Sequence, residues 1–166
     1  MNEIVKNELQ NIMMFDQYNS VNSQLNIINK CNKLLSNDDF CKEYIATLDC
    51  YFNRQNLQIV DLPQIILGMQ RNVISHFGDV LNLYHTIQPE DMKYILYGLL
   101  YDYIMKFHPD FIDGKLVEFR LEFNNVFELI MTSKKQFKVK NKIFTRFFHW
   151  LCCCTAMKTK ESEPIK

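Results

Sequence analysis

Residues 88–109, "QPEDMKYILYGLLYDYIMKFHP", decide the fold class that we expect for this chain. Pro89 suits the first turn of a helix, and the acids Glu90 and Asp91 suit the positive end of the helix dipole. The pair His108-Pro109 predicts the end of the helix, because a proline disfavours helical geometry in the residue before it. Between these limits the stretch is apolar on nearly every side, which is typical of a helix at the centre of a domain. The residues expected to face the core are Met92, Ile95, Leu96, Leu99, Tyr103 and Phe107, with Leu100 and Tyr101 widening the stripe.

The segments around this stretch have the same helical periodicity. In residues 61–78, "DLPQIILGMQRNVISHFG", Asp61 can cap a helix and Gly78 can end it. Asn37 is expected to cap a further helix, and helices are also predicted near residues 3–14 and 116–130. Only four glycines and four prolines are present, too few for the turns of a β-sandwich. We therefore predict an all-α fold, a compact bundle of about five to seven helices with a basic amphipathic C-terminal helix. In residues 20–35 one face is expected to carry Val21, Leu25, Ile28, Cys31 and Leu35.

Two of these segments, "IVDLPQIILGMQRNVISHF" and "MKYILYGLLYDYIMKF", are similar to small helical proteins of AT-rich large DNA viruses. The resemblance covers about residues 59–107 and contains no diagnostic motif. It implies a viral origin, but no activity and no functional residue.

The sequence contains none of the motifs that carry common catalytic chemistry. There is no P-loop, dinucleotide fingerprint, HExxH or GxSxG motif. His76, His85 and His108 share no metal-ligand spacing, so we expect no metal, no cofactor and no enzymatic activity. The remaining chemistry-bearing side chains are interpreted as structural. Cys31, Cys41 and Cys50 are expected to act as small core residues, and Tyr94, Tyr97, Tyr101 and Tyr103 to pack with their hydroxyls at the rim.

Charge divides the chain into two parts. Residues 1–133 contain ten basic and seventeen acidic side chains, a net charge of −7, whereas residues 134–166 contain nine and two, a net charge of +7. Such asymmetry indicates an anionic partner for the basic part. We predict a helical body at 1–133, a basic aromatic and Cys-rich amphipathic helix at 134–154, and a polar tail at 155–166.

The segment "NKIFTRFFHWLCCCTAMK", residues 141–158, carries the functional prediction. Drawn as a helix, it places aromatic residues on one side and bases on the other, as in helices that lie in a membrane interface. Adjacent cysteines beside such a helix are candidates for S-acylation. The bases expected to contact lipid phosphates are Lys134, Lys135, Lys138, Lys142 and Arg146. The residues expected to insert are Phe144, Phe147, Phe148, Trp150 and Leu151, and those expected to be acylated are Cys152, Cys153 and Cys154.

Other interpretations of this segment stay open. It can be the last helix of the bundle, with its aromatic face on the core. It can also be a calmodulin-type helix anchored by Phe137, Phe144 and Trp150. Metal binding by His149, Cys152 and Cys153 has no evident fourth ligand. Nucleic-acid binding is disfavoured because the acidic body would repel a polyanion.

The sequence therefore predicts a non-enzymatic interaction or scaffold protein whose basic segment holds it on an anionic membrane surface. The polar start "MNEIVKNELQ" does not read as a signal peptide, and no apolar run reaches the ~18 residues of a membrane span. We expect the cytoplasmic side of a membrane, peripheral attachment and no secretion. The alternative is a structural component of a larger, viral assembly whose C-terminal helix packs on protein.

Overall fold

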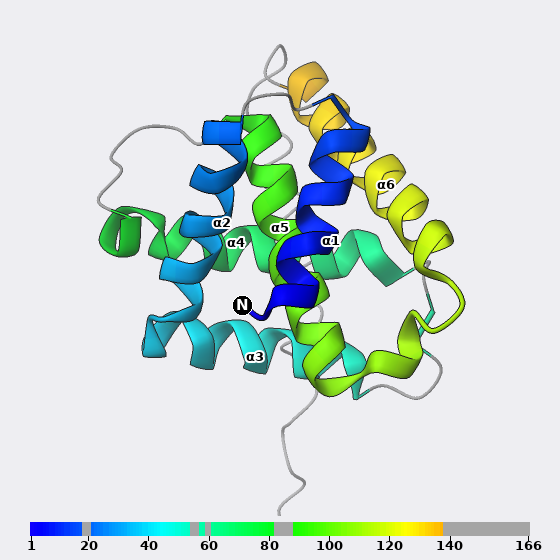
Figure 1. Cartoon of the computed structure of the whole chain (residues 1–166), viewed down its shortest axis with the longest axis horizontal. Coiled ribbons are helices and arrows are strands. Elements are labelled where there is room, and N and C mark those ends of the chain that lie inside the picture. Colours follow the sequence, from blue (N-terminus) through cyan, green and yellow to red (C-terminus); the bar gives the residue numbers. More distant parts are fainter. Residues whose placement is uncertain (18–20, 54–56, 59–60, 82–87, 138–166) are drawn as a thin grey trace, which may run out of the picture. The chain divides into compact units, whose positions relative to one another are not determined.

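The described part of the chain is built from α-helices joined by turns. The computed structural model describes residues 1–17, 21–53, 57–58, 61–81 and 88–137. These residues contain six α-helices, one short 3-10 helix and no strand, so the all-α prediction is confirmed. The elements are α1 (Glu3–Phe15), α2 (Val21–Leu35), α3 (Asp38–Phe52), α4 (Leu62–Leu81), α5 (Pro89–Phe107), the 3-10 helix η2 (Pro109–Phe111) and α6 (Leu116–Phe137) (Figure 1).

The chain separates into two units, Met1–Glu128 and a second unit that starts at Leu129. The description below concerns the first unit unless stated otherwise. Helix α6 continues without interruption through residues 133 and 134, where the sequence predicts the start of the tail segment, and ends at Phe137. The three-part division of the chain stays a prediction.

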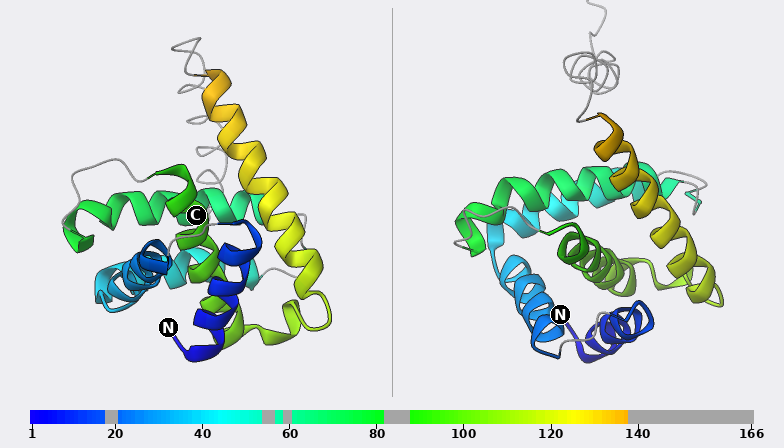
Figure 2. Two further views of the ribbon diagram at one scale, coloured as in Figure 1. Left: turned by 45° about the horizontal axis from the view of Figure 1, so that its top comes forward. Right: turned by 90° about the horizontal axis from the view of Figure 1, so that it is seen from above.

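Helix α5 is the centre of the first unit. It contacts α1, α2, α4 and η2, and the right view of Figure 2, which looks roughly along α5, shows α4 on one side of it and α1 and α2 on the other. Its middle turns are completely buried on every side, from Ile95 through Leu100. This is the position expected for a helix that is apolar all round.

Polar side chains and proline set the helix ends. The Asn37 side chain accepts a hydrogen bond from the backbone N–H of Phe40 at 2.8 Å, and Asn2 accepts one from Val5 at 2.9 Å. These bonds satisfy backbone donors that the first turn of a helix leaves unpaired. Helix α5 begins at Pro89 and has His108 as its C-cap, as the sequence predicts.

A glycine allows α5 to approach two neighbours at once. A Cβ atom at Gly98 would lie 2.9 Å from Cδ2 of Leu9 on α1 and 3.4 Å from Sγ of Cys31 on α2. Real Cβ atoms essentially never come as close as the first distance. The missing side chain therefore fixes the spacing between α5 and the α1–α2 pair.

Three sequence-based expectations are wrong. Helix α4 continues past Gly78 to Leu81, since glycine weakens a helix by only about 1 kcal/mol and ends it only where the chain turns. Val21 and Leu25 are exposed, because α2 buries residues of its later turns, from Ile27 to Leu34, instead. Phe107 is also exposed, since it lies in the last turn of α5.

Candidate functional site

A buried polar cluster joins three helices of the first unit. The Glu8 carboxylate on α1 accepts hydrogen bonds from the Arg120 guanidinium on α6 and, at 2.5 Å, from the Tyr97 hydroxyl on α5. Glu8 is only 5 % exposed, so its charge depends on these donors. Burial, followed by the hydrogen bond to Glu8, raises the pKa of Tyr97, and the same carboxylate raises the pKa of Arg120. The cluster therefore joins α6 to α1 and α5 through one buried carboxylate.

The sequence contains one signal for this cluster. Glu8 lies between Val5 and Ile12 on the apolar stripe of α1, where a carboxylate needs a partner. Arg120 lies 112 positions away, so spacing along the chain does not identify it as that partner. The tyrosine prediction was partly wrong, because the Tyr97 hydroxyl is buried in the cluster and does not lie at the rim.

A second buried carboxylate belongs to Asp102 on α5. Its Oδ2 atom accepts from the Lys106 ammonium at 2.6 Å, one turn further along the helix. Its buried Oδ1 atom has no hydrogen-bond partner among the described residues. Burial, with a smaller contribution from the Asp102 charge, raises the pKa of the nearby Cys31 thiol to about 12. The Cys31 thiol is therefore protonated and inert at neutral pH.

The other cysteines and histidines of the described residues have ordinary structural surroundings. Cys41 is half-buried and Cys50 is exposed, so the core prediction holds for Cys31 and is wrong for Cys50. His76 pairs with Glu43 at 2.7 Å, and the His108 ring stacks on Phe52. The described residues contain no group of three or more His, Cys, Asp or Glu side chains that could hold a metal ion.

Apolar side chains are exposed where α1 ends and α2 begins. We name this set the α1–α2 apolar corner: Met14, Phe15, Val21 and Leu25. Phe15 is 83 % exposed and Val21 is 68 % exposed. The C-terminal end of α1 and the N-terminal end of α2 lie at the same end of this helix pair (Figure 1). Large exposed apolar side chains at one end of a helix pair make this corner a candidate surface for binding another molecule.

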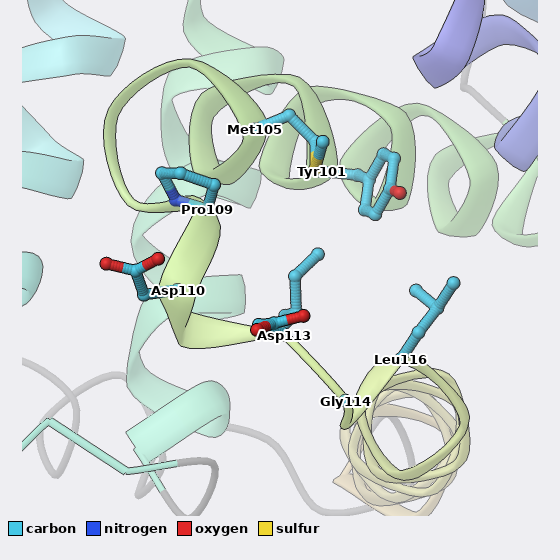
Figure 3. Close-up of a pocket in the computed structure, with 8 residues that line it drawn as sticks. Tyr101, Met105, Pro109, Asp110, Asp113, Gly114 and Leu116 are labelled. Carbon is cyan, nitrogen blue, oxygen red and sulfur yellow. The ribbon is translucent and has the colours of Figure 1, made fainter.

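A pocket of about 370 Å³ lies between the later turns of α5 and the turn that leads into α6. We name it the α5–α6 pocket. Gly114 has a φ of 65°, a left-handed conformation that favours glycine, and this turn brings Leu116 opposite α5. Figure 3 shows Tyr101 and Met105 on one side of the space and Asp113 and Leu116 on the other. The complete lining is Tyr101, Met105, Pro109, Asp110, Ile112, Asp113, Gly114 and Leu116.

Tyr101 places a polar group in this largely apolar wall. The residue is 5 % exposed. Burial, followed by the charge of Glu8, raises its pKa, so the hydroxyl stays protonated at neutral pH. The sequence assigned Tyr101 to helix packing, and its stacking on Tyr97 at 6.0 Å agrees with that role. Its position in the pocket depends on the turn at Gly114, which the periodicity of α5 alone does not reveal.

The residues predicted to bind membrane lie mostly outside the described residues. Lys134 and Lys135 are residues of α6 and lie in the second unit. None of the described helices is long and apolar enough to cross a membrane. The positions outside the described residues are Lys138, Lys142, Phe144, Arg146, Phe147, Phe148, Trp150, Leu151, Cys152, Cys153 and Cys154.

Comparison with known proteins gives no family for this chain. No family model matches it, and neither a curated protein nor a solved structure is similar enough to count as a match.

Proposed function

We propose that this protein is a non-enzymatic helical interaction protein that its C-terminal segment attaches to a membrane surface. The observation that supports the interaction role is the α1–α2 apolar corner. An exposed apolar side chain loses its contact with water only when a partner covers it, at about 25 cal/mol per Å² of buried apolar area. Because Phe15 and Val21 are so exposed, this corner can supply the buried centre of a protein interface.

The membrane part of the proposal rests on the composition of the chain beyond Ser133. Six bases and no acid occur between Lys134 and Leu151, interleaved with aromatic residues and followed by three adjacent cysteines. Each base near an anionic leaflet contributes about 1 kcal/mol, and acyl chains on the cysteines would make attachment stable. The net charge of −7 on residues 1–133 would keep the helical body away from the same anionic surface.

Photo-crosslinking in cells tests the interaction role. p-Benzoylphenylalanine placed at Phe15 should give a discrete protein adduct, because a partner would cover this side chain. The same group at Asn11, an exposed position one turn earlier, is the matched control. Adduct formation from position 15 should fall after Val21→Ser. Equal adducts from both positions, or none from position 15, would contradict the proposed interaction.

The structural-component alternative is favoured by a second exposed apolar pair. Val117 and Leu121 lie one turn apart on α6 and are both exposed. Head-to-tail assembly of identical copies requires two different surfaces on each copy, and the corner and this pair are two different exposed apolar sets. Sedimentation velocity of the full chain at increasing concentration separates the two functions. Concentration-dependent growth that Val117→Ser abolishes would support the assembly alternative.

A further inference from the structure

We propose that the α5–α6 pocket binds an arginine side chain presented by a partner protein. This inference rests on the proposed interaction function and deepens it, because it names the chemistry that the partner brings to one site. The pocket has apolar walls, an acidic rim and the hydroxyl of Tyr101 in its lining.

The walls of the pocket fit the stem of a long side chain. Met105, Ile112 and Leu116 supply apolar surface from α5, the turn and α6. A volume of about 370 Å³ lies at the low end of the range for ligand pockets, so it suits one or two side chains. Long basic side chains commonly lay their methylene stems along such a surface while the charged head reaches polar groups.

The rim selects a positive charge. Asp110 and Asp113 both line the pocket, are exposed, and have no ion-pair partner among the described residues. Residues 109–115, which form the turn, contain two acids and one base, Lys115. The nearby Arg120 charge is neutralised by Glu8, and the Lys106 charge by Asp102. The charges that line the pocket mouth therefore favour a cationic group over an anionic one.

The Tyr101 hydroxyl favours a planar donor over an uncharged apolar group. Tyr101 is nine-tenths buried, and Figure 3 shows its hydroxyl on the side of the pocket where Leu116 lies. A purely apolar ligand would bury this oxygen without a hydrogen bond, which costs about 1–3 kcal/mol. A guanidinium carries five N–H donors in a flat fork, so it can donate to the hydroxyl oxygen and to a carboxylate at the same time. Its flat face can also lie against the tyrosine ring.

Methyl NMR of the full chain with two short peptides tests this inference. The probes are acetyl-Leu-Arg-Leu-amide and the same peptide with citrulline, which has nearly the shape of arginine without its charge. The arginine peptide should shift the methyl signals of Met105, Ile112 and Leu116 saturably. The citrulline peptide should bind at least about tenfold more weakly, since it loses the charge-assisted hydrogen bonds.

Variants of the acidic rim and of Tyr101 separate the contribution of charge to peptide binding from that of the pocket's shape. The double variant Asp110→Asn with Asp113→Asn should weaken binding of the arginine peptide about tenfold, and Tyr101→Phe about threefold. Glu118→Gln with Glu128→Gln, exposed acids of α6 outside the lining, changes the net charge equally and should leave binding within twofold. Equal binding of the two peptides, shifts confined to other methyl groups, or no shift at all would overturn the inference. Crosslinking from position 15 is a separate readout, so a failure at this pocket leaves the proposed function standing.

Discussion

Replacing Arg120 with methionine should destabilise the protein more than any exchange of an exposed ion pair. The change removes the guanidinium that pairs with the Glu8 carboxylate and keeps most of the apolar stem. Glu8 would then be left in the core with the Tyr97 hydroxyl as its remaining hydrogen-bond donor.

The magnitude follows from the burial of the two partners. Removing one member of a buried ion pair costs about 3–5 kcal/mol, because the other charge stays buried without compensation. The Glu8 side chain is 6 % exposed, but that of Arg120 is 33 % exposed, and solvent screening reduces the pair's contribution. We therefore expect the low end, about 3 kcal/mol, for Arg120→Met. Glu8→Gln should cost less, about 1.5 kcal/mol, since the amide still accepts from Tyr97 and Arg120 can reach water.

Urea denaturation followed by circular dichroism at 222 nm measures these free energies of unfolding. The double variant Glu8→Gln with Arg120→Met leaves no unpaired charge in the core, so it should be at least 1 kcal/mol more stable than additivity of the single variants predicts. Lys42→Met serves as the matched control, because its pair with Asp39 is exposed and should contribute less than about 0.5 kcal/mol. Strict additivity of Glu8 and Arg120, or equal losses for Arg120→Met and Lys42→Met, would refute the reasoning.

Three further predictions follow from packing, capping and thiol burial. Gly98→Ala should lower stability by about 1–2 kcal/mol in thermal unfolding, since the new Cβ atom would meet Leu9 and the better helix propensity of alanine offsets only part of the overpacking cost. Asn37→Ala should lower it by about 1 kcal/mol through loss of the cap, and Asn37→Asp should retain most of the stability. Maleimide labelling with peptide mapping should modify Cys50 under native conditions and Cys31 only in denaturant. Because burial raises the pKa of Cys31 from 9.0 to about 12, the stability that the protonated thiol contributes is present below pH 9 and is lost between pH 9 and pH 12. The loss in that interval should be smaller in Cys31→Ala.

The sequence predicted helix position and helix ends best where a segment is apolar on nearly every side. Residues 88–109 are apolar all round, so their central position and both helix ends could be predicted from patterning and proline placement. The exposure of Val21 and Leu25 could not be predicted, because Ile28 and Cys31 on the same face of α2 are buried. Only the packing of α2 against its neighbouring helices decides which of its turns are covered.

The candidate site was harder to predict than the fold. Glu8 and Arg120 are separated by 112 positions in the sequence, and only the packing of α1, α5 and α6 brings them together. The α5–α6 pocket likewise depends on the left-handed turn at Gly114, which places residues of a loop opposite a helix. The spacing of residues along the chain predicts neither the Glu8–Arg120 pair nor the pocket. A carboxylate on an apolar stripe, such as Glu8, indicates only that a partner exists.

Liposome co-sedimentation of the full chain is the most direct test of membrane attachment, the central claim of this account. The comparison variant replaces Lys134, Lys135, Lys138, Lys142 and Arg146 with glutamine, and neutral and anionic vesicles are tested at low and high salt. The unmodified chain should pellet with anionic vesicles, less at high salt and less with neutral lipid, and the glutamine variant should stay in the supernatant. A control variant that removes three positive charges elsewhere, with Lys33, Lys42 and Lys115 changed to glutamine, should still pellet, because these exposed lysines belong to the helical body. Membrane attachment through the basic segment is contradicted if the full chain does not pellet with anionic vesicles, or if both variants pellet as well as the unmodified chain.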